Sequence, residues 1–142
     1  MNDKKIKEKF GDYYKADENT FKMGIDIRIT EIISERFEDQ IVLETCSGAG
    51  FTTIPLARKA KHIYTVEINK LHQEQSIENI DKAMLSNKVT FILGDILDNN
   101  LIIKLPKHEL QHIYMDREHV LYCLYFGNLI RNVGSTKLIV KA

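Results

Sequence analysis

Three carboxylates and two glycines are the residues of this 142-residue chain whose types and spacing point most directly to chemistry. Glu44, Glu67 and Asp95 each stand at the end of a short apolar run, and Gly48 and Gly50 follow the first of them closely. A carboxylate accepts hydrogen bonds from hydroxyl, amine and ammonium groups, and a glycine turn lets the backbone approach a ligand. Together they predict a binding site for a small polar molecule.

Short apolar runs predict the strands that must position these residues. Residues 41–43 (IVL) predict a buried strand that Glu44 ends, and further strands are expected at residues 62–68, 89–95, 110–116 and 137–142. Helices are expected between them at residues 53–60, 71–85 and 120–132, the first capped by Thr52 or Thr53 with Pro55 in its first turn. This alternation is typical of an α/β fold with a mostly parallel sheet, helices on both faces and ligands bound at the carboxyl ends of the strands.

Two helices are expected to turn an apolar face toward the sheet. Residues 24–37 would form the first, with its face made of Ile25, Ile29, Ile32, Ile33 and Phe37. The helix at residues 71–85 would do the same with Leu71, Ile77, Ile80 and Met84. Residues 1–23 alternate polar and aromatic side chains and predict a segment that either folds over the site or stays loose.

Composition limits the classes of protein to consider. Lys plus Arg and Asp plus Glu number 20 each, so no global basic field supports a nucleic-acid partner, although it does not exclude RNA. No apolar run approaches the roughly 20 residues of a membrane helix, which predicts a cytoplasmic protein. Two cysteines form no disulfide framework. We expect one domain over residues 1–142, with residues 1–23 as an extension and 24–142 as the core.

Each acid suits a different part of one ligand. Glu67, at the end of the second strand, has two oxygens that match the two hydroxyls of a ribose. Asp95 is placed to accept from an adenine amine, and Glu44 from an ammonium group, directly or through water. S-adenosylmethionine carries all three groups. NAD is a more distant alternative, because a dinucleotide favours a free helix N-terminus for its pyrophosphate and a third glycine near Thr53.

The segments ETCSGAGFTT, VEIN and LGDIL resemble motifs I, II and III of the Rossmann-like class I methyltransferases. In particular the chain resembles the trimethylguanosine synthase group, the RNA cap guanine-N2 methyltransferases, and KADENTFKMGIDIRITEII is similar to the segment before that family's first core helix. The resemblance implies S-adenosylmethionine as cofactor and direct methyl transfer, without a metal, to RNA or another amine nucleophile. It also implies a fold that here lacks the family's last strands.

The resemblance assigns parts of the cofactor to individual residues. Glu44 and the glycine turn would contact the methionine end, Glu67 the ribose, and Asp95 the adenine, whose ring two isoleucines would flank. The full predicted set is Glu44, Cys46, Ser47, Gly48, Ala49, Gly50, Thr53, Glu67, Ile68, Asp95 and Ile96.

The predicted catalytic loop departs from the family pattern. After the fourth strand the family places Asn, Asp or Ser with two prolines and an aromatic residue, whereas residues 116–119 read DREH, and the chain has no tryptophan. Asp116 is the candidate acceptor of an amine proton. Two functions stay open: a methyltransferase, and a non-catalytic domain that binds S-adenosylmethionine.

Structural alternatives accompany several of these residues. Glu67 could be a solvated strand end, Asp95 a turn cap, and Cys46 a small packing residue. Five residues recur at helical spacing suited to a metal, but a strand at residues 110–116 would separate them onto two faces, so no metal site is predicted: His108, His112, Asp116, His119 and Cys123. The apolar strand KLIVKA at residues 137–142 is expected to pair across a homodimer or to be covered by the N-terminal segment.

Overall fold

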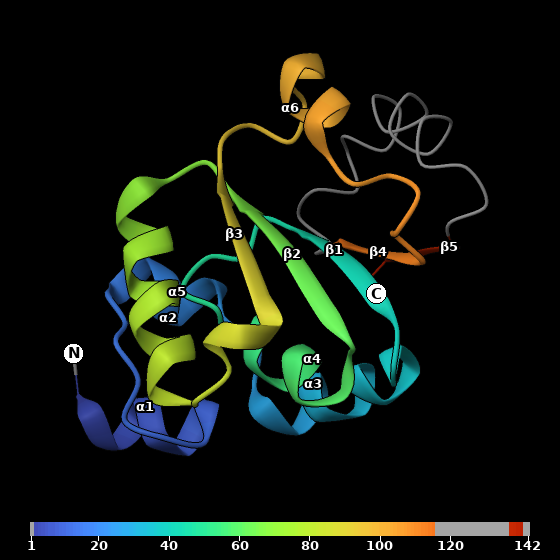
Figure 1. Ribbon diagram of the computed structural model, residues 1–142. Helices are drawn as coiled ribbons and strands as arrows, with labels where there is room; N and C mark the ends of the chain where they lie inside the picture. The colour runs from blue at the N-terminus through green and yellow to red at the C-terminus, as the bar shows by residue number, and fades with distance from the viewer. Residues whose placement is uncertain (1, 116–136, 141–142) are drawn as a thin grey trace.

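A five-stranded parallel sheet forms the centre of the molecule, in the order β3-β2-β1-β4-β5. The computed structural model describes residues 2–115 and 137–140. The strands are β1 (Ile41–Thr45), β2 (His62–Glu67), β3 (Val89–Leu93), β4 (His112–Met115) and β5 (Lys137–Val140), shown in Figure 1. The predicted parallel α/β fold is confirmed. Asp116 and the helix expected at residues 120–132 lie outside the described residues.

The strand order makes the end of β1 the natural ligand position. The chain leaves β1 toward β2 and β3 on one side and returns to β4 on the other side, so connections diverge at the carboxyl end of β1. In the register, Glu44 of β1 lies beside Thr65 of β2. β1 runs one residue beyond Glu44, to Thr45, whereas β2 and β3 end earlier than expected, at Glu67 and Leu93.

Helices cover both faces of the sheet, and each face has its own apolar cluster. On one face the cluster includes Ile6, Phe37, Ile54 and Ile80, and on the other Leu43, Val66, Ile102 and Met115. The first face carries α1 (Asp3–Phe10), α3 (Ile27–Ser34), η1 (Glu35–Phe37), α4 (Thr53–Lys59) and α5 (Lys70–Lys82), and the second carries α6 (Asn99–Lys104). A short η2 (Ser86–Lys88) leads into β3. No helix in the described part of the chain is long and apolar enough to cross a membrane.

The predicted apolar faces of α3 and α5 are both wrong in part. In α3 the hydroxyl residues Thr30 and Ser34 are buried, while Ile29 and Ile32 are 52% and 65% exposed. Each buried hydroxyl donates to a carbonyl of its own helix, at 3.2 Å for Thr30 and 2.6 Å for Ser34. Such short, internally satisfied side chains let α3 pack closely on α4.

In α5 the buried residues are Ser76, Asn79 and Ile80. The other three residues of the predicted face are exposed: Leu71, Ile77 and Met84. Asn79 is buried on this face because it meets the backbone of two non-helical segments, whose N–H and C=O groups need hydrogen-bonding partners. Ser76 is small enough to pack against Gly50 of the turn.

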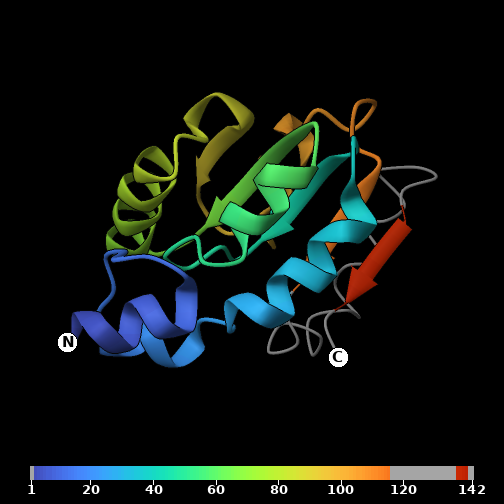
Figure 2. The same ribbon diagram turned by 90° about the horizontal axis from the view of Figure 1, so that it is seen from below.

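The N-terminal segment is folded against the sheet face that carries α5 (Figure 2). Of the two expectations for residues 1–23, folding over the site and staying loose, the first is the one that the structure shows. The ring of Phe10 stacks on that of Phe51, with centroids 3.6 Å apart and an angle of 4° between the planes. Ile6 and Tyr14 are buried beside this pair. α2 (Glu18–Met23) follows, begun by a capping box between Asp17 and Thr20. Residues 13–24, called the strap below, connect α1 to α3.

Candidate functional site

A pocket of about 290 Å³ lies at the carboxyl ends of β1 and β2. Its walls come from the turn after β1, the start of α5, the strap and β4. The lining residues are Thr20, Met23, Gly24, Glu44, Cys46, Ser47, Gly48, Ala49, Phe51, Thr52, Glu67, Ile68, Asn69, His72 and Tyr114. The structure therefore brings seven of the predicted binding residues together: Glu44, Cys46, Ser47, Gly48, Ala49, Glu67 and Ile68.

Glu44 is held at this pocket by two hydroxyl groups. Its side chain is buried, and one oxygen accepts from Thr53 Oγ at 2.6 Å and from Thr65 Oγ at 2.9 Å. Thr53 thus stands behind Glu44 instead of lining the pocket. Thr52 occupies the N-cap position of α4, but its side chain makes no capping hydrogen bond. The two threonines fix the direction of the carboxylate.

Glu67 joins the glycine turn to the end of β2. One carboxylate oxygen accepts from the Gly48 N–H at 2.7 Å, and the other accepts from the Asn69 N–H at 2.8 Å. Only 6% of the residue is exposed, so the alternative of a solvated strand end is wrong. An ionised carboxylate offers about four lone-pair sites, which leaves capacity for ligand hydroxyl groups.

The turn itself needs a left-handed backbone at three positions. Cys46, Gly48 and Gly50 have φ values of 61°, 55° and 86°. A Cβ added at Gly50 would lie 2.7 Å from Ser76 Oγ, so the missing side chain lets the turn pack directly on α5. A Cβ at Gly48 would meet nothing within 4 Å, because that side faces the pocket. Cys46 also packs against the apolar cluster of the opposite sheet face, as its structural alternative predicted.

Ser47 adds a polar group to the pocket wall. Its side chain is buried in the pocket wall, and Oγ has no hydrogen-bond partner among the described residues. A buried hydroxyl without a partner destabilises a fold unless a ligand supplies one. The pocket therefore combines two oriented carboxylates with a hydroxyl that a ligand can satisfy.

Several pocket residues were missed by the sequence analysis. Phe51 and Asn69 lie within the recognised segments, and Asn69 caps α5 by accepting from the N–H groups of Leu71 and His72. Their position within the motifs was a usable signal. The strap residues and Tyr114 are distant in sequence, and only the folded chain brings them to the pocket: Thr20, Met23, Gly24 and Tyr114.

Asp95 and Ile96 are not among the residues that line this pocket. Asp95 lines a separate cavity of about 490 Å³ on the α6 side, and its carboxylate accepts from the Leu97 N–H at 2.9 Å. The turn-cap alternative for Asp95 is confirmed. Ile96 is buried in the apolar cluster of that face. Their contacts with an adenine stay predictions, whereas Ile68 is 66% exposed at the pocket and open to a planar ring.

Two of the five possible metal ligands fall in the described part of the chain. His112 lies on β4, as the strand alternative required, and His108 precedes it in a loop. Asp116, His119 and Cys123 lie outside the described residues. Within residues 2–115 and 137–140 there is no group of three or more His, Cys, Asp or Glu side chains placed to hold a metal.

A parallel sheet of this order, with a glycine turn after β1 and carboxylates at the ends of β1 and β2, defines a class I S-adenosylmethionine-dependent methyltransferase domain. The family profile described as RNA cap guanine-N2 methyltransferase matches residues 39–126. The chain belongs to this family.

Comparisons with individual proteins agree with the class. The chain is 31% identical over 102 residues to the tRNA (guanine(37)-N(1))-methyltransferase of Pyrococcus abyssi, covering 68% of this chain and 29% of that protein. It is 38% identical over 64 residues to ribosomal RNA small subunit methyltransferase A of Desulfotalea psychrophila, covering 42% and 19%. The chain therefore spans less than a third of either relative. Precorrin-6y C5,15-methyltransferase of Geobacter metallireducens shares the fold, with a TM-score of 0.70, 11% identity and coverage of 91% and 68%.

Proposed function

We propose that this chain binds S-adenosylmethionine in the pocket at the ends of β1 and β2 and transfers its methyl group to RNA or another amine nucleophile. The observation that carries the proposal is that Glu44, Glu67 and Ser47 line one cavity beside a glycine turn, and that the Ser47 hydroxyl has no hydrogen-bond partner in the part of the chain that the structure describes. The family of the chain and the RNA substrates named for two relatives support it.

The polar groups of the pocket suggest how the ligand lies. Glu67 is anchored by two backbone N–H groups and would accept from the ribose hydroxyls with its remaining lone pairs. Glu44, held deeper by two threonines, would offer negative charge to the ammonium group. The exposed side chain of Ile68 would pack on the adenine. Both carboxylates in this arrangement have a direction that the fold already fixes.

Positioning is the main catalytic contribution that such a domain makes. The sulfonium is an activated methyl donor: the amine lone pair attacks the methyl carbon, the carbon–sulfur bond breaks, and the amine then loses a proton. The chain must hold the two reactants in line, which is worth several powers of ten in rate. We propose Asp116 as the residue that accepts the proton.

Calorimetry with S-adenosylhomocysteine, S-adenosylmethionine and NAD tests the cofactor. We expect both adenosyl sulfur compounds to bind and NAD to bind more weakly. A preference for NAD would overturn the proposal. Transfer of a labelled methyl group from S-adenosylmethionine to total RNA, to protein and to small amines then tests the reaction. Binding without transfer to any of these acceptors would favour a non-catalytic domain.

The proposal extends to a homodimer through the edge of the sheet. β5 ends the sheet among the described strands and pairs with β4, while the strap and α1 lie at the opposite end (Figure 2). The strap and α1 do not cover β5, so the alternative that the N-terminal segment covers this strand is wrong. An edge strand of apolar composition favours pairing with a second copy. Light scattering after size exclusion should give twice the mass of the chain, and a monomer at high concentration would contradict this part.

A further inference from the structure

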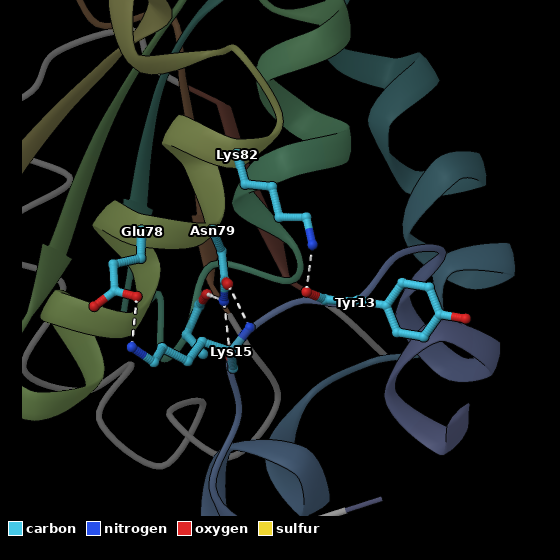
Figure 3. Close-up of polar contacts among 6 residues, drawn as sticks. Tyr13, Lys15, Glu78, Asn79 and Lys82 are labelled. Carbon is cyan, nitrogen blue, oxygen red and sulfur yellow. Dashed lines mark hydrogen bonds and ion pairs between the residues drawn. The ribbon is translucent and has the colours of Figure 1, made fainter. Parts of the chain in front are cut away.

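Asn79 links the two walls of the pocket without lining it. It projects from α5, is 1% exposed, and makes three hydrogen bonds. Its Nδ2 donates to the Lys15 carbonyl at 2.8 Å and to the Ala49 carbonyl at 2.9 Å, while its Oδ1 accepts from the Lys15 N–H at 2.6 Å. Figure 3 shows this amide between the strap and α5. Lys15 belongs to the strap, and Ala49 belongs to the glycine turn.

Only a primary amide can make this set of contacts. Asn79 pairs with both the N–H and the C=O of Lys15, much as one strand pairs with another, and its second N–H reaches the turn. A carboxylate at this position would keep the acceptor and lose both donors, and an alkyl group would lose all three contacts. Either change leaves buried backbone groups without partners, which is costly.

The other contacts between α5 and the strap are more exposed. Lys15 Nζ lies 2.7 Å from the Glu78 carboxylate, but both side chains are more than half exposed. Lys82 Nζ donates to the Tyr13 carbonyl at 2.6 Å. Exposed pairs of this kind contribute little to stability. They fasten the strap to α5, and neither reaches the glycine turn.

Gln75 adds a contact one turn earlier on α5. Its Nε2 donates to the Asp17 carboxylate at 2.9 Å, and its Oε1 accepts from Thr20 Oγ at 3.0 Å. These bonds hold the start of α2, which carries strap residues of the pocket wall. Asn79 differs from Gln75 because it reaches both the strap and the turn from one buried amide.

We propose that Asn79 is a positioning residue that holds the strap in register with the glycine turn, so that the pocket is formed before the ligand arrives. The strap wall consists of Thr20, Met23 and Gly24, and the turn wall includes Ser47, Gly48 and Ala49. This inference rests on the proposed function, since it concerns the same S-adenosylmethionine pocket. If the strap moves away from the glycine turn, fewer molecules have a formed pocket, and the apparent affinity for S-adenosylmethionine falls in proportion.

Affinity for S-adenosylhomocysteine in matched variants tests this role. Asn79→Asp and Asn79→Leu should raise the Kd about tenfold, as expected if about one molecule in ten keeps the strap in place. Glu78→Gln removes the neighbouring exposed ion pair and should change the Kd less than about twofold. Ile102→Val trims the apolar cluster on the opposite sheet face and should lower Tm without changing the Kd. Unchanged affinity in a folded Asn79 variant would overturn the inference, as would an equal loss in Ile102→Val.

Hydrogen exchange in the unaltered chain gives a second test that needs no variant. Binding of S-adenosylhomocysteine should slow exchange of the Lys15 amide together with the amides of the glycine turn, because one side chain connects them. Protection of the turn alone would overturn the inference even if every Asn79 variant fails to fold. If the unaltered chain binds no adenosyl ligand at all, the proposed function fails instead.

Discussion

A carboxylate stands at or just after the end of each of the strands β1, β2 and β3, but these carboxylates do not share one site. Glu44 and Glu67 share one pocket, whereas Asp95 turns to a separate cavity and caps the backbone that follows it. The difference lies in the donors that each carboxylate meets. Glu67 and Asp95 both accept from the N–H of a residue two positions ahead. Glu67 also accepts from Gly48 in the glycine turn, and Glu44 accepts from Thr65 of β2, whereas Asp95 makes only the local contact among the described residues.

A carboxylate after a strand therefore has two competing partners. A local backbone N–H is always within reach of an Asp side chain, and an Asx turn forms without any tertiary structure. A distant donor directs the side chain only when the sheet register supplies it, as Thr65 does beside Glu44. The position of an acid in a motif predicts that it binds a ligand. Whether its side chain points to the pocket depends on the hydrogen-bond donors around it.

The largest effect is expected from Glu67→Ala. The change removes the acceptor for the Gly48 and Asn69 N–H groups and for the ribose, so affinity for S-adenosylhomocysteine should fall by about tenfold or more. Glu74→Ala, on the exposed surface of α5, is the control. Calorimetry measures both. If Glu67→Ala and Glu74→Ala bind S-adenosylhomocysteine equally well, the ribose does not contact Glu67. The distinction between the carboxylates of β1 and β2 and Asp95 after β3 would then be contradicted.

Glu44→Gln should have the next largest effect. The amide keeps the shape but loses the charge, so we expect about fivefold weaker binding of a ligand with an ammonium group. Thr65→Val removes one hydroxyl that holds Glu44 and leaves the charge in place. If charge matters more than orientation, calorimetry will show a smaller loss in Thr65→Val than in Glu44→Gln, and the reverse order would contradict the electrostatic role.

Ser47→Ala should separate binding from stability. Because Oγ lacks a partner in the described residues, its removal should leave the free energy of unfolding of the free chain unchanged or higher. A ligand that satisfies this hydroxyl would lose one hydrogen bond, so the Kd should rise about threefold. Thermal unfolding with and without S-adenosylhomocysteine measures both quantities. A less stable free chain with unchanged Kd would show that Ser47 is only structural.

The smallest effect is expected from Asp95→Asn. Asparagine can still accept from the Leu97 N–H, so the turn should persist. If Asp95 faces its own cavity when ligand is bound, affinity should change less than about twofold. A loss of tenfold would show that the loop rearranges to place Asp95 on the adenine, and it would remove the distinction between the strand ends.

The sequence was sufficient for the parts of the fold that depend on local pattern. The buried strand IVL, the glycine turn and the acids at two strand ends all lie where their types and spacing predicted. The face of α5 was mistaken because amphipathicity assumes an apolar neighbour. Its actual neighbours are the strap and the glycine turn: their backbone groups bond to Asn79, and the small side chain of Ser76 packs against Gly50. The sequence left open whether residues 1–23 fold over the site, and it did not identify the strap residues that line the pocket, because no motif joins Thr20 to residues so far along the chain.

The stacked rings of Phe10 and Phe51 bear on how much of the chain is needed to form the pocket. The family match begins at residue 39, so it contains the turn and Phe51 but neither α1 nor the strap. A fragment cut at that boundary would keep every recognised segment, yet it would uncover the face of an aromatic ring beside the pocket and lack one of the pocket's walls. The smallest self-sufficient piece of this protein is therefore longer than its family signature, by the helices that precede it.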